Sequence, residues 1–291
     1  MTLFEPSQNW RIDDTLAFLT QTFSHYGGES PSLDASVLLC FVLDKPRSYL
    51  LTWPEKTLLP EQIADLDQVA QRRCNGEPVA YILGEREFWS LPLNVSPSTL
   101  IPRPDTERLV ELALEKALMT TGALLDLGTG TGAIALALAS ELPQRRIIGI
   151  DLKEEARDLA QSNADKLNIK NASFLSGSWF SPLTKEATFS VIVSNPPYID
   201  KDDPHLALGD VRFEPLSALV ADDNGLADIK HISHHAISYI ELNGWLLFEH
   251  GYDQGNAVRD ILIQQGYHNV KTEQDYGGRD RVTIGQWVNS N

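Results

Sequence analysis

Four consecutive residues, Asn195-Pro196-Pro197-Tyr198, combine groups that suit a planar target bearing an NH2 group. They follow an apolar run at 189–193 that is typical of a short buried strand. Two prolines end the hydrogen-bond ladder of a sheet because neither has an N–H group, and the residue before a proline is held extended. The sequence therefore predicts a stiff segment whose carbonyl oxygens accept N–H groups while its aromatic ring covers the flat face of the target.

A glycine-rich turn lies upstream of this Asn-Pro-Pro-Tyr motif, between apolar segments at 123–127 and 133–139. The turn consists of Gly128, Thr129, Gly130, Thr131 and Gly132. Glycines let a backbone approach a ligand closely, and the first turn of a helix offers unpaired N–H groups to an anion. Another apolar segment, 146–150, ends in Asp151, whose carboxylate can accept hydrogen bonds from both hydroxyls of a ribose. The pattern indicates a nucleoside-containing cofactor, a description that a dinucleotide also satisfies.

Two features favour S-adenosylmethionine over a dinucleotide. Asp126, which precedes the turn, is expected to hold an amino group, whereas its charge would repel a pyrophosphate. The Asn-Pro-Pro-Tyr motif follows a later strand of the same predicted sheet, and nothing in hydride transfer requires it. The order and spacing of these elements predict a class I methyltransferase that modifies a planar nitrogen.

Other segments extend the pattern over nearly the whole chain. They are Pro78-Val79-Ala80-Tyr81-Ile82-Leu83-Gly84, Glu87-Phe88-Trp89, Leu100-Ile101-Pro102-Arg103-Pro104-Asp105-Thr106-Glu107, Phe248-Glu249-His250-Gly251 and Asp275-Tyr276-Gly277-Gly278-Arg279-Asp280-Arg281-Val282. With the two motifs above, they closely resemble the bacterial peptide chain release factor glutamine N5-methyltransferases. The segment at 100–107 is the selective one, since DNA adenine and some ribosomal RNA guanine methyltransferases share the Asn-Pro-Pro-Tyr motif.

The resemblance implies methyl transfer from S-adenosylmethionine to the side-chain amide N5 of the glutamine in the Gly-Gly-Gln motif of translation termination factors. Asn195, Pro196 and Tyr198 would be catalytic, and Pro197 would join them in binding the substrate. The cofactor would be bound by Gly128, Thr129, Gly130, Thr131, Gly132, Asp151 and Asn195, with Trp179 stacked on its adenine. The Asn195 side-chain oxygen and the Pro196 carbonyl would accept the two amide N–H groups, more strongly as positive charge grows on the nitrogen.

The composition of the 291-residue chain, 42% hydrophobic and 22% charged, is typical of a soluble globular protein. No apolar run is long enough to span a membrane and no signal-sequence pattern is present, so we expect a cytoplasmic enzyme with no membrane association. Forty acidic and 24 basic residues give a net charge of −16, which disfavours a grip on a nucleic-acid backbone and suits a basic protein partner. We expect no direct nucleic-acid binding, a monomer, and free thiols at Cys40 and Cys74.

The chain is expected to comprise a helical substrate-docking domain at 1–77, a β-hairpin linker at 78–100 and a methyltransferase domain at 101–291. The helical domain could instead simply cover its neighbour. Apolar spacing predicts helices that begin near Asp13, Ser32 and Pro60, a hairpin at 88–95 and a helix at 105–118. Strands are predicted at 123–127, 146–150, 172–175, 189–193, 245–249 and 281–287, and helices at 132–141, 153–167, 225–241 and 253–265. This alternation predicts an α/β fold with a Rossmann-like doubly wound sheet, to which class I methyltransferases add an antiparallel last strand.

Three histidines, His231, His234 and His235, have the spacing of one helix face. No cysteine or acidic ligand motif accompanies them, so we expect an exposed or packed face and no metal site. The acidic residues at 200–203 and 222–223 predict a loop over the active site that is either merely solvated or in contact with the substrate.

Two alternative functions stay open. A nucleic-acid methyltransferase that acts on adenine N6 or guanine N2 would present the same NH2 geometry to the motif, but the chain has no basic segment or evident target-recognition domain. A noncatalytic cofactor-binding module that scaffolds translation proteins would not need the intact Asn-Pro-Pro-Tyr motif.

Overall fold

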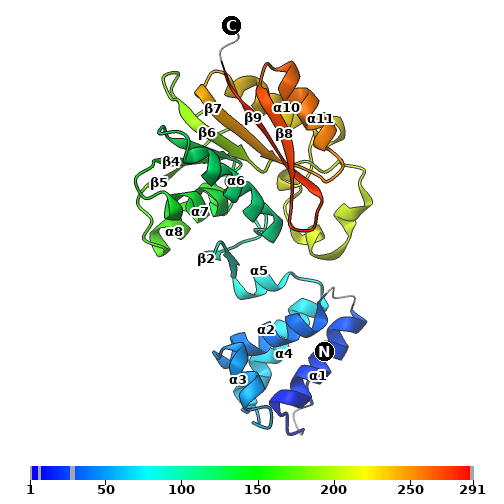
Figure 1. Cartoon of the computed structure of the whole chain (residues 1–291). Coiled ribbons are helices and arrows are strands. Elements are labelled where there is room, and N and C mark those ends of the chain that lie inside the picture. The colour runs from blue at the N-terminus through cyan, green and yellow to red at the C-terminus, as the bar shows by residue number, and fades with distance from the viewer. Residues whose placement is uncertain (1, 6–7, 27–29, 289–291) are drawn as a thin grey trace. The chain divides into compact units, whose positions relative to one another are not determined.

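A computed structural model describes residues 2–5, 8–26 and 30–288 of the chain (Figure 1). It divides into two compact units. The helical unit comprises Met1–Glu85 together with Pro204–Phe213, and the sheet unit comprises Arg86–Asp203 and Glu214–Asn291. The chain therefore leaves the sheet unit shortly after the Asn-Pro-Pro-Tyr motif and returns to it ten residues later.

The helical unit is built from α1 (Ile12–His25), α2 (Pro31–Leu43), α3 (Arg47–Thr52), α4 (Pro60–Cys74) and α5 (Val79–Leu83). The three predicted helices are confirmed as α1, α2 and α4, whereas the short α3 and α5 were missed. Pro31 and Pro60 occupy the first turns of α2 and α4, where a missing N–H group costs no hydrogen bond. Leu19, Phe23, Leu38 and Leu66 are fully buried in a core of its own. Cys40 and Cys74 are free, half-buried thiols, as expected.

An ion-pair cluster joins the segment Pro204–Phe213 to the helices of this unit. The Arg73 side chain, only 9% exposed, pairs through Nε with Asp34 at 2.8 Å and through Nη1 with Asp210 at 2.9 Å. The segment itself forms two short 3₁₀ turns, Pro204–Ala207 and Gly209–Phe213. Local sequence patterns did not predict this connection, because Arg73 and Asp210 are 137 positions apart in the chain.

The sheet unit contains a seven-stranded sheet in the order β5-β4-β3-β6-β7-β9-β8. The strands are β3 (Leu124–Leu127), β4 (Ile147–Asp151), β5 (Ala172–Ser176), β6 (Phe189–Ser194), β7 (Ile240–Glu249), β8 (His268–Gln274) and β9 (Asp280–Gln286). Neighbours from β5 to β7 are parallel, whereas β9 is antiparallel to both β7 and β8. The predicted doubly wound sheet with an antiparallel last strand is confirmed, although β8 was missed.

A separate two-stranded hairpin, β1 (Glu85–Phe88) and β2 (Leu91–Asn94), precedes the sheet. Its two-residue turn, Trp89 and Ser90, has positive φ angles of 54° and 59°, a geometry that matches the twist of hairpin strands. The hairpin begins three residues earlier than expected. The 3₁₀ turn η1 (Pro104–Thr106) then leads into α6 (Glu107–Ala117), close to the predicted helix.

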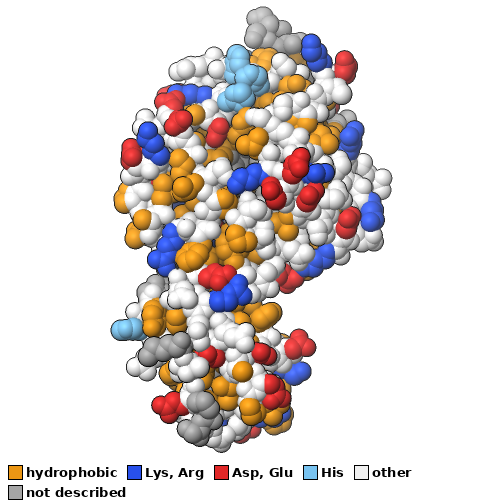
Figure 2. Space-filling model, turned by 180° about the vertical axis from the view of Figure 1, so that it is seen from behind, with side chains coloured by type: hydrophobic (Ala, Val, Ile, Leu, Met, Phe, Trp, Pro, Cys, Tyr) orange, Lys and Arg blue, Asp and Glu red, His pale blue; other side chains and the backbone are white. Residues whose placement is uncertain are grey.

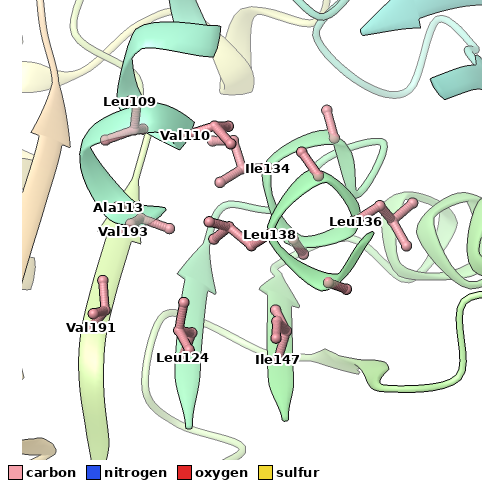
Figure 3. Close-up of a cluster of buried hydrophobic side chains, with 14 of the residues drawn as sticks. Leu109, Val110, Ala113, Leu124, Ile134, Leu136, Leu138, Ile147, Val191 and Val193 are labelled. Atoms are coloured by element: carbon pink, nitrogen blue, oxygen red, sulfur yellow. The ribbon is translucent and has the colours of Figure 1, made fainter. Parts of the chain in front are cut away.

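Helices cover both faces of the sheet. On one face α6, α7 (Ala133–Glu141) and α8 (Glu154–Lys166) pack on alternate strand residues such as Leu124, Ile147 and Val191 (Figure 3). On the other face α10 (Ala227–Ala236) and α11 (Gly255–Gln264) pack on the intervening residues, among them Leu125, Ile148 and Ile192. The strands are apolar on both faces because both are buried.

One predicted helix, 225–241, is wrong in its extent. The helix there, α10, spans only Ala227–Ala236. Just before it lies α9 (Asp222–Gly225), in which Asp223 and Asn224 have left-handed backbone angles that keep the helix from starting earlier. The last residues of the predicted helix belong to β7, which begins at Ile240 and therefore starts five residues before the predicted strand.

The surface carries mixed charge. On the face shown in Figure 2, lysine and arginine side chains are scattered among acidic ones and form no continuous basic band. Among the residues that the structure describes, no helix has both the length and the apolar character needed to cross a membrane.

Strand β7 provides a matched test of the core. Leu246 is fully buried and Leu242 is 53% exposed on the same strand. We expect Leu246→Ala to lower the free energy of unfolding by about 2–5 kcal/mol, since it leaves a cavity. Leu242→Ala should change it by no more than about 0.5 kcal/mol. Urea denaturation followed by tryptophan fluorescence measures both, and equal effects would contradict the difference in burial between these two positions.

Candidate functional site

The site lies where the carboxyl ends of β3, β4 and β6 meet, the usual ligand position in open α/β sheets. A cavity of about 260 Å³ opens there. From the predicted set it is lined by Gly128, Thr129, Gly130, Thr131, Asp151, Trp179, Asn195 and Pro197. Gly132, Pro196 and Tyr198 are not among the lining residues. The structure thus brings predicted residues from four separate sequence segments to one cavity.

The glycine-rich turn needs its glycines for two different reasons. Gly128, Gly130 and Gly132 all have positive φ angles, of 73°, 54° and 81°, which residues with a Cβ rarely adopt. Gly132 is also the N-cap of α7, and a Cβ there would lie 3.0 Å from the Ala160 Cβ. Gly132 therefore shapes the turn from behind, whereas Gly128 and Gly130 form the cavity wall.

Asp126 is placed differently from our expectation. It is fully buried and absent from the cavity lining, and its Oδ1 has no hydrogen-bond partner among the described residues. Its Oδ2 accepts hydrogen bonds from Thr129 Oγ1 at 2.6 Å and from the Ala135 N–H at 3.2 Å. Burial raises its pKa to about 7, against the effect of these two bonds. Asp126 therefore ties the glycine-rich turn to the first turn of α7.

Asp151 lines the cavity at the end of β4, as predicted. Its Oδ2 accepts the Gly130 N–H at 2.9 Å and its Oδ1 accepts the Lys153 N–H at 3.0 Å. These bonds fix the carboxylate beside the turn, and a carboxylate oxygen has further lone pairs with which to accept hydroxyl groups.

Trp179 follows β5 and lines the same cavity. It has a positive φ of 49° and its ring lies beside Gly128, where a Cβ would be 3.7 Å from the indole. The half-buried indole also packs against the core of the sheet unit, so it combines a structural role with a flat surface that faces the cavity.

The Asn-Pro-Pro-Tyr motif leaves the end of β6 in an extended form without regular secondary structure. Asn195 and Pro197 line the cavity, whereas Pro196 is buried and the half-buried Tyr198 is not among the lining residues. Burial raises the pKa of the Tyr198 phenol above its ordinary value, and the nearby Glu249 charge acts in the same direction. The Tyr198 carbonyl accepts a hydrogen bond from Gln254 Nε2 at 3.0 Å, which fixes the end of the motif.

Several lining residues were not among the predicted site residues. They are Ser98, Thr99, Leu100, Pro102, Arg103, Thr106, Ala133, Ile134, Ile150, Leu152, Lys153, Gly177, Ser178, Ser217, Ala218 and Asp228. The segment at 100–107, which carries the family resemblance, could have indicated Arg103 and Thr106. Arg103 Nη2 pairs with the buried Glu214 at 2.7 Å, and Glu214 also accepts the Ile101 N–H at 3.2 Å. This segment is therefore held as one wall of the cavity.

The α10 histidines lie on the surface of the sheet unit, and Figure 2 shows histidine side chains gathered there. The His231 and His235 rings stack with their centroids 4.2 Å apart. Within residues 2–5, 8–26 and 30–288, no group of three potential ligands could hold a metal ion.

Comparisons with known proteins agree with this geometry. Residues 14–84 match the family model described as PrmC N-terminal domain, and residues 120–276 match the one described as methyltransferase domain. The solved hMettl16 catalytic domain, in complex with MAT2A 3'UTR hairpin 1, has a TM-score of 0.56. It shows 15% identity and covers 76% of this chain and 80% of its own, so the likeness concerns the fold alone.

Curated relatives extend over nearly the whole chain. The release factor glutamine methyltransferase of Vibrio cholerae is 66% identical and covers 95% of this chain and 96% of its own. That of Escherichia coli is 54% identical and covers 89% of this chain and 93% of its own. Identity at this level across both units shows that the chain belongs to the release factor glutamine methyltransferase family.

Proposed function

We propose that the protein methylates the side-chain amide N5 of the glutamine in the Gly-Gly-Gln motif of peptide chain release factors, in the cytoplasm, with S-adenosylmethionine as the methyl donor. The observation that carries this proposal is the single cavity that Asn195, Asp151 and the glycine-rich turn share. The relatives with this name at 54–66% identity support the choice of substrate.

The cavity fits the proposed cofactor in its chemistry. Asp151 has free lone pairs for ribose hydroxyls, the Trp179 indole offers a flat surface, and Gly128 and Gly130 leave the backbone open to close approach. When bound, S-adenosylmethionine supplies an electrophilic methyl group. We assign its binding to Gly128, Thr129, Gly130, Thr131, Asp151, Trp179 and Asn195, with Gly132 supporting the turn.

The protein's own contribution is to position a weak nucleophile. The lone pair of an amide nitrogen is delocalised into its carbonyl group, so the nitrogen must be held and its charge stabilised. We assign one N–H to Asn195 Oδ1 and the other to the Pro196 carbonyl, while Pro197 and Tyr198 keep the segment rigid. Both hydrogen bonds strengthen as positive charge develops on nitrogen, so they favour the transition state over the ground state.

A nucleic-acid amino group could meet the same two acceptors, and the fold match to hMettl16 does not discriminate between these substrates. The net charge of −16 disfavours binding to a nucleic-acid backbone.

The test is to incubate the protein with tritiated S-adenosylmethionine and, in separate reactions, with release factor, DNA or ribosomal RNA. We expect label in release factor only. A release factor variant in which the glutamine of the Gly-Gly-Gln motif is replaced should take up no label. Label in nucleic acid alone would overturn the proposal.

We also propose that the helical unit helps to dock the release factor. A glutamine side chain offers little binding energy, so contacts elsewhere on a folded substrate must contribute to its positioning. The helical unit has its own core yet exposes large apolar side chains: Tyr26, Leu33, Phe41, Leu51, Trp53 and Leu59. Exposed apolar side chains of this kind can contribute to an interaction surface.

Two substitutions should separate the substrate role from the cofactor role. Asn195→Ala should lower kcat by about two to three orders of magnitude, the usual cost of one transition-state hydrogen-bond group, and change cofactor affinity by less than about tenfold. Asp151→Ala should weaken cofactor binding by about 1.5–3 kcal/mol for each charge-assisted bond and leave kcat at saturation nearly unchanged. Calorimetry with the demethylated product and steady-state kinetics measure the two effects. Equal losses of affinity and kcat in both variants would contradict the division of roles.

The docking role predicts a difference between intact and short substrates. Replacing Leu33, Phe41, Leu51 and Trp53 of the helical unit together with serine should lower kcat/KM for intact release factor about tenfold. A short Gly-Gly-Gln peptide should be an equally poor substrate for the altered and the unaltered protein. The matched control replaces four exposed residues of the sheet unit with serine: Leu118, Met119, Leu242 and Ile263. An equal loss in the control, or no loss in the helical variant, would move recognition to the sheet unit.

A further inference from the structure

Glu249, the last residue of β7, is a buried carboxyl group beside the Asn-Pro-Pro-Tyr motif. Only 2% of it is exposed, and it does not line the cavity. Strands β6 and β7 are parallel with Ser194 opposite Phe248, which puts Glu249 level with Asn195. Its Oε2 has no hydrogen-bond partner among the described residues. A carboxylate in this position acts on the motif and not directly on a ligand in the cavity.

Two hydroxyl or amide groups connect Glu249 to the motif. Thr106 and Asn195 lie close enough to the Glu249 carboxylate to oppose the effect of burial on its pKa. Asn195 Nδ2 also donates to Thr106 Oγ1 at 3.3 Å. The NH2 group of Asn195 is therefore directed towards Thr106, and both residues lie beside the Glu249 carboxylate.

The orientation of the Asn195 amide follows from this pairing. An amide has one acceptor oxygen and two N–H donors, whereas an ionised carboxylate only accepts. If the Asn195 amide were turned over, Oδ1 would face the Glu249 carboxylate and two acceptors would repel each other. The ionised Glu249 thus leaves Oδ1 for the cavity that Asn195 lines.

We propose that Glu249 is a positioning residue which, together with Thr106, fixes the Asn195 amide so that Oδ1 faces the substrate amide. This inference rests on the proposed function. A reversed Asn195 would present N–H groups to the N–H groups of the glutamine and could not hold it. The negative charge of Glu249 also polarises the Asn195 amide through its NH2 group, which strengthens acceptance at Oδ1 as the substrate nitrogen gains positive charge.

The charged and titratable groups around Glu249 come from several elements. Arg281 on β9 lowers the pKa of Glu249 and Asp105 in η1 raises it, while the charge of Glu249 in turn raises the pKa of Tyr198. Burial is the largest effect and raises the pKa of Glu249 to about 7. The neighbouring His250 has a lowered pKa, also because of burial. The positioning effect should therefore be lost as the pH falls through about 7, because protonated Glu249 no longer repels Oδ1.

The test substitutes Glu249→Gln, whose amide can face Asn195 either way. We expect kcat at pH 8 to fall about 10- to 100-fold, cofactor affinity to stay within about threefold, and the dependence of kcat on an ionisation near pH 7 to disappear. Glu249→Asp should recover part of the loss. The control, Glu241→Gln near the start of the same strand, should leave kcat and its pH profile unchanged. An unchanged kcat and pH profile in Glu249→Gln would overturn the proposal.

Two further measurements separate positioning from general damage. In an Asn195→Ala background, Glu249→Gln should cause no further loss of kcat, since its effect passes through Asn195; a full additional loss would overturn the proposal. If Glu249→Gln fails to fold, Thr106→Val and Thr106→Ser replace it, and only the valine variant should lose kcat. Equal kcat in these two variants would also overturn it.

A spectroscopic readout does not require the proposed reaction. The side-chain NH2 signals of Asn195, labelled with nitrogen-15, should shift with a midpoint near pH 7 in the unaltered protein and should not in Glu249→Gln. If these signals do not respond to Glu249, the inference is wrong even if release factor is methylated. If they respond but release factor takes up no label, the proposed function fails and the inference about the amide stands.

Discussion

Parallel pairing of β3 with both β4 and β6 is the constraint on which the site depends. Leu127 lies opposite Ile150 on one side and Ser194 on the other, so the next residues, Gly128, Asp151 and Asn195, emerge at one level of the sheet. A shift of either register by one residue would turn the strand side chains to the opposite face and misplace the turn or the motif. The tightly packed layers of helices on both faces make such a shift costly.

Two carboxyl groups near the site are buried, and their burial lowers the stability of the folded state at neutral pH. Asp126 and Glu249 both have a pKa of about 7 because burial disfavours their charged forms. Since the folded-state pKa lies above the ordinary value near 4, the folded state holds their protons more tightly, and each group costs stability as the pH rises from about 4 to 7. Asp126 offsets part of this cost with its hydrogen bonds to Thr129 and to the Ala135 N–H, which fix the glycine-rich turn. For Glu249, the neighbouring Thr106 and Asn195 oppose part of the effect of burial.

The segment that follows the motif belongs in turn to both units. After Asp203 the chain joins the helical unit, where Asp210 pairs with Arg73, and from Glu214 onward it belongs to the sheet unit again. Glu214 then binds Arg103 and the Ile101 N–H in the cavity wall. The later part of this ten-residue excursion and the return to the sheet unit are therefore fixed by Asp210 and Glu214, both held by charged partners. A substrate bound on the helical unit would act on a segment that is covalently continuous with the motif.

The sequence by itself determined the sheet, the glycine-rich turn, Asp151 and the Asn-Pro-Pro-Tyr motif, because local apolar periodicity and the backbone restrictions of glycine and proline act over a few residues. It also indicated the family, through segments such as 100–107. Only the tertiary structure decided that Asp126 is buried with Oδ2 bound to the first turn of α7, that 204–213 belongs to the helical unit, and that Glu249 lies level with Asn195 on the neighbouring strand. Each of these depends on which face of a strand a side chain takes or on which distant segments pack together. Burial then sets the charge of Asp126 and Glu249, and burial is a property of the packed layers that no short stretch of residues contains.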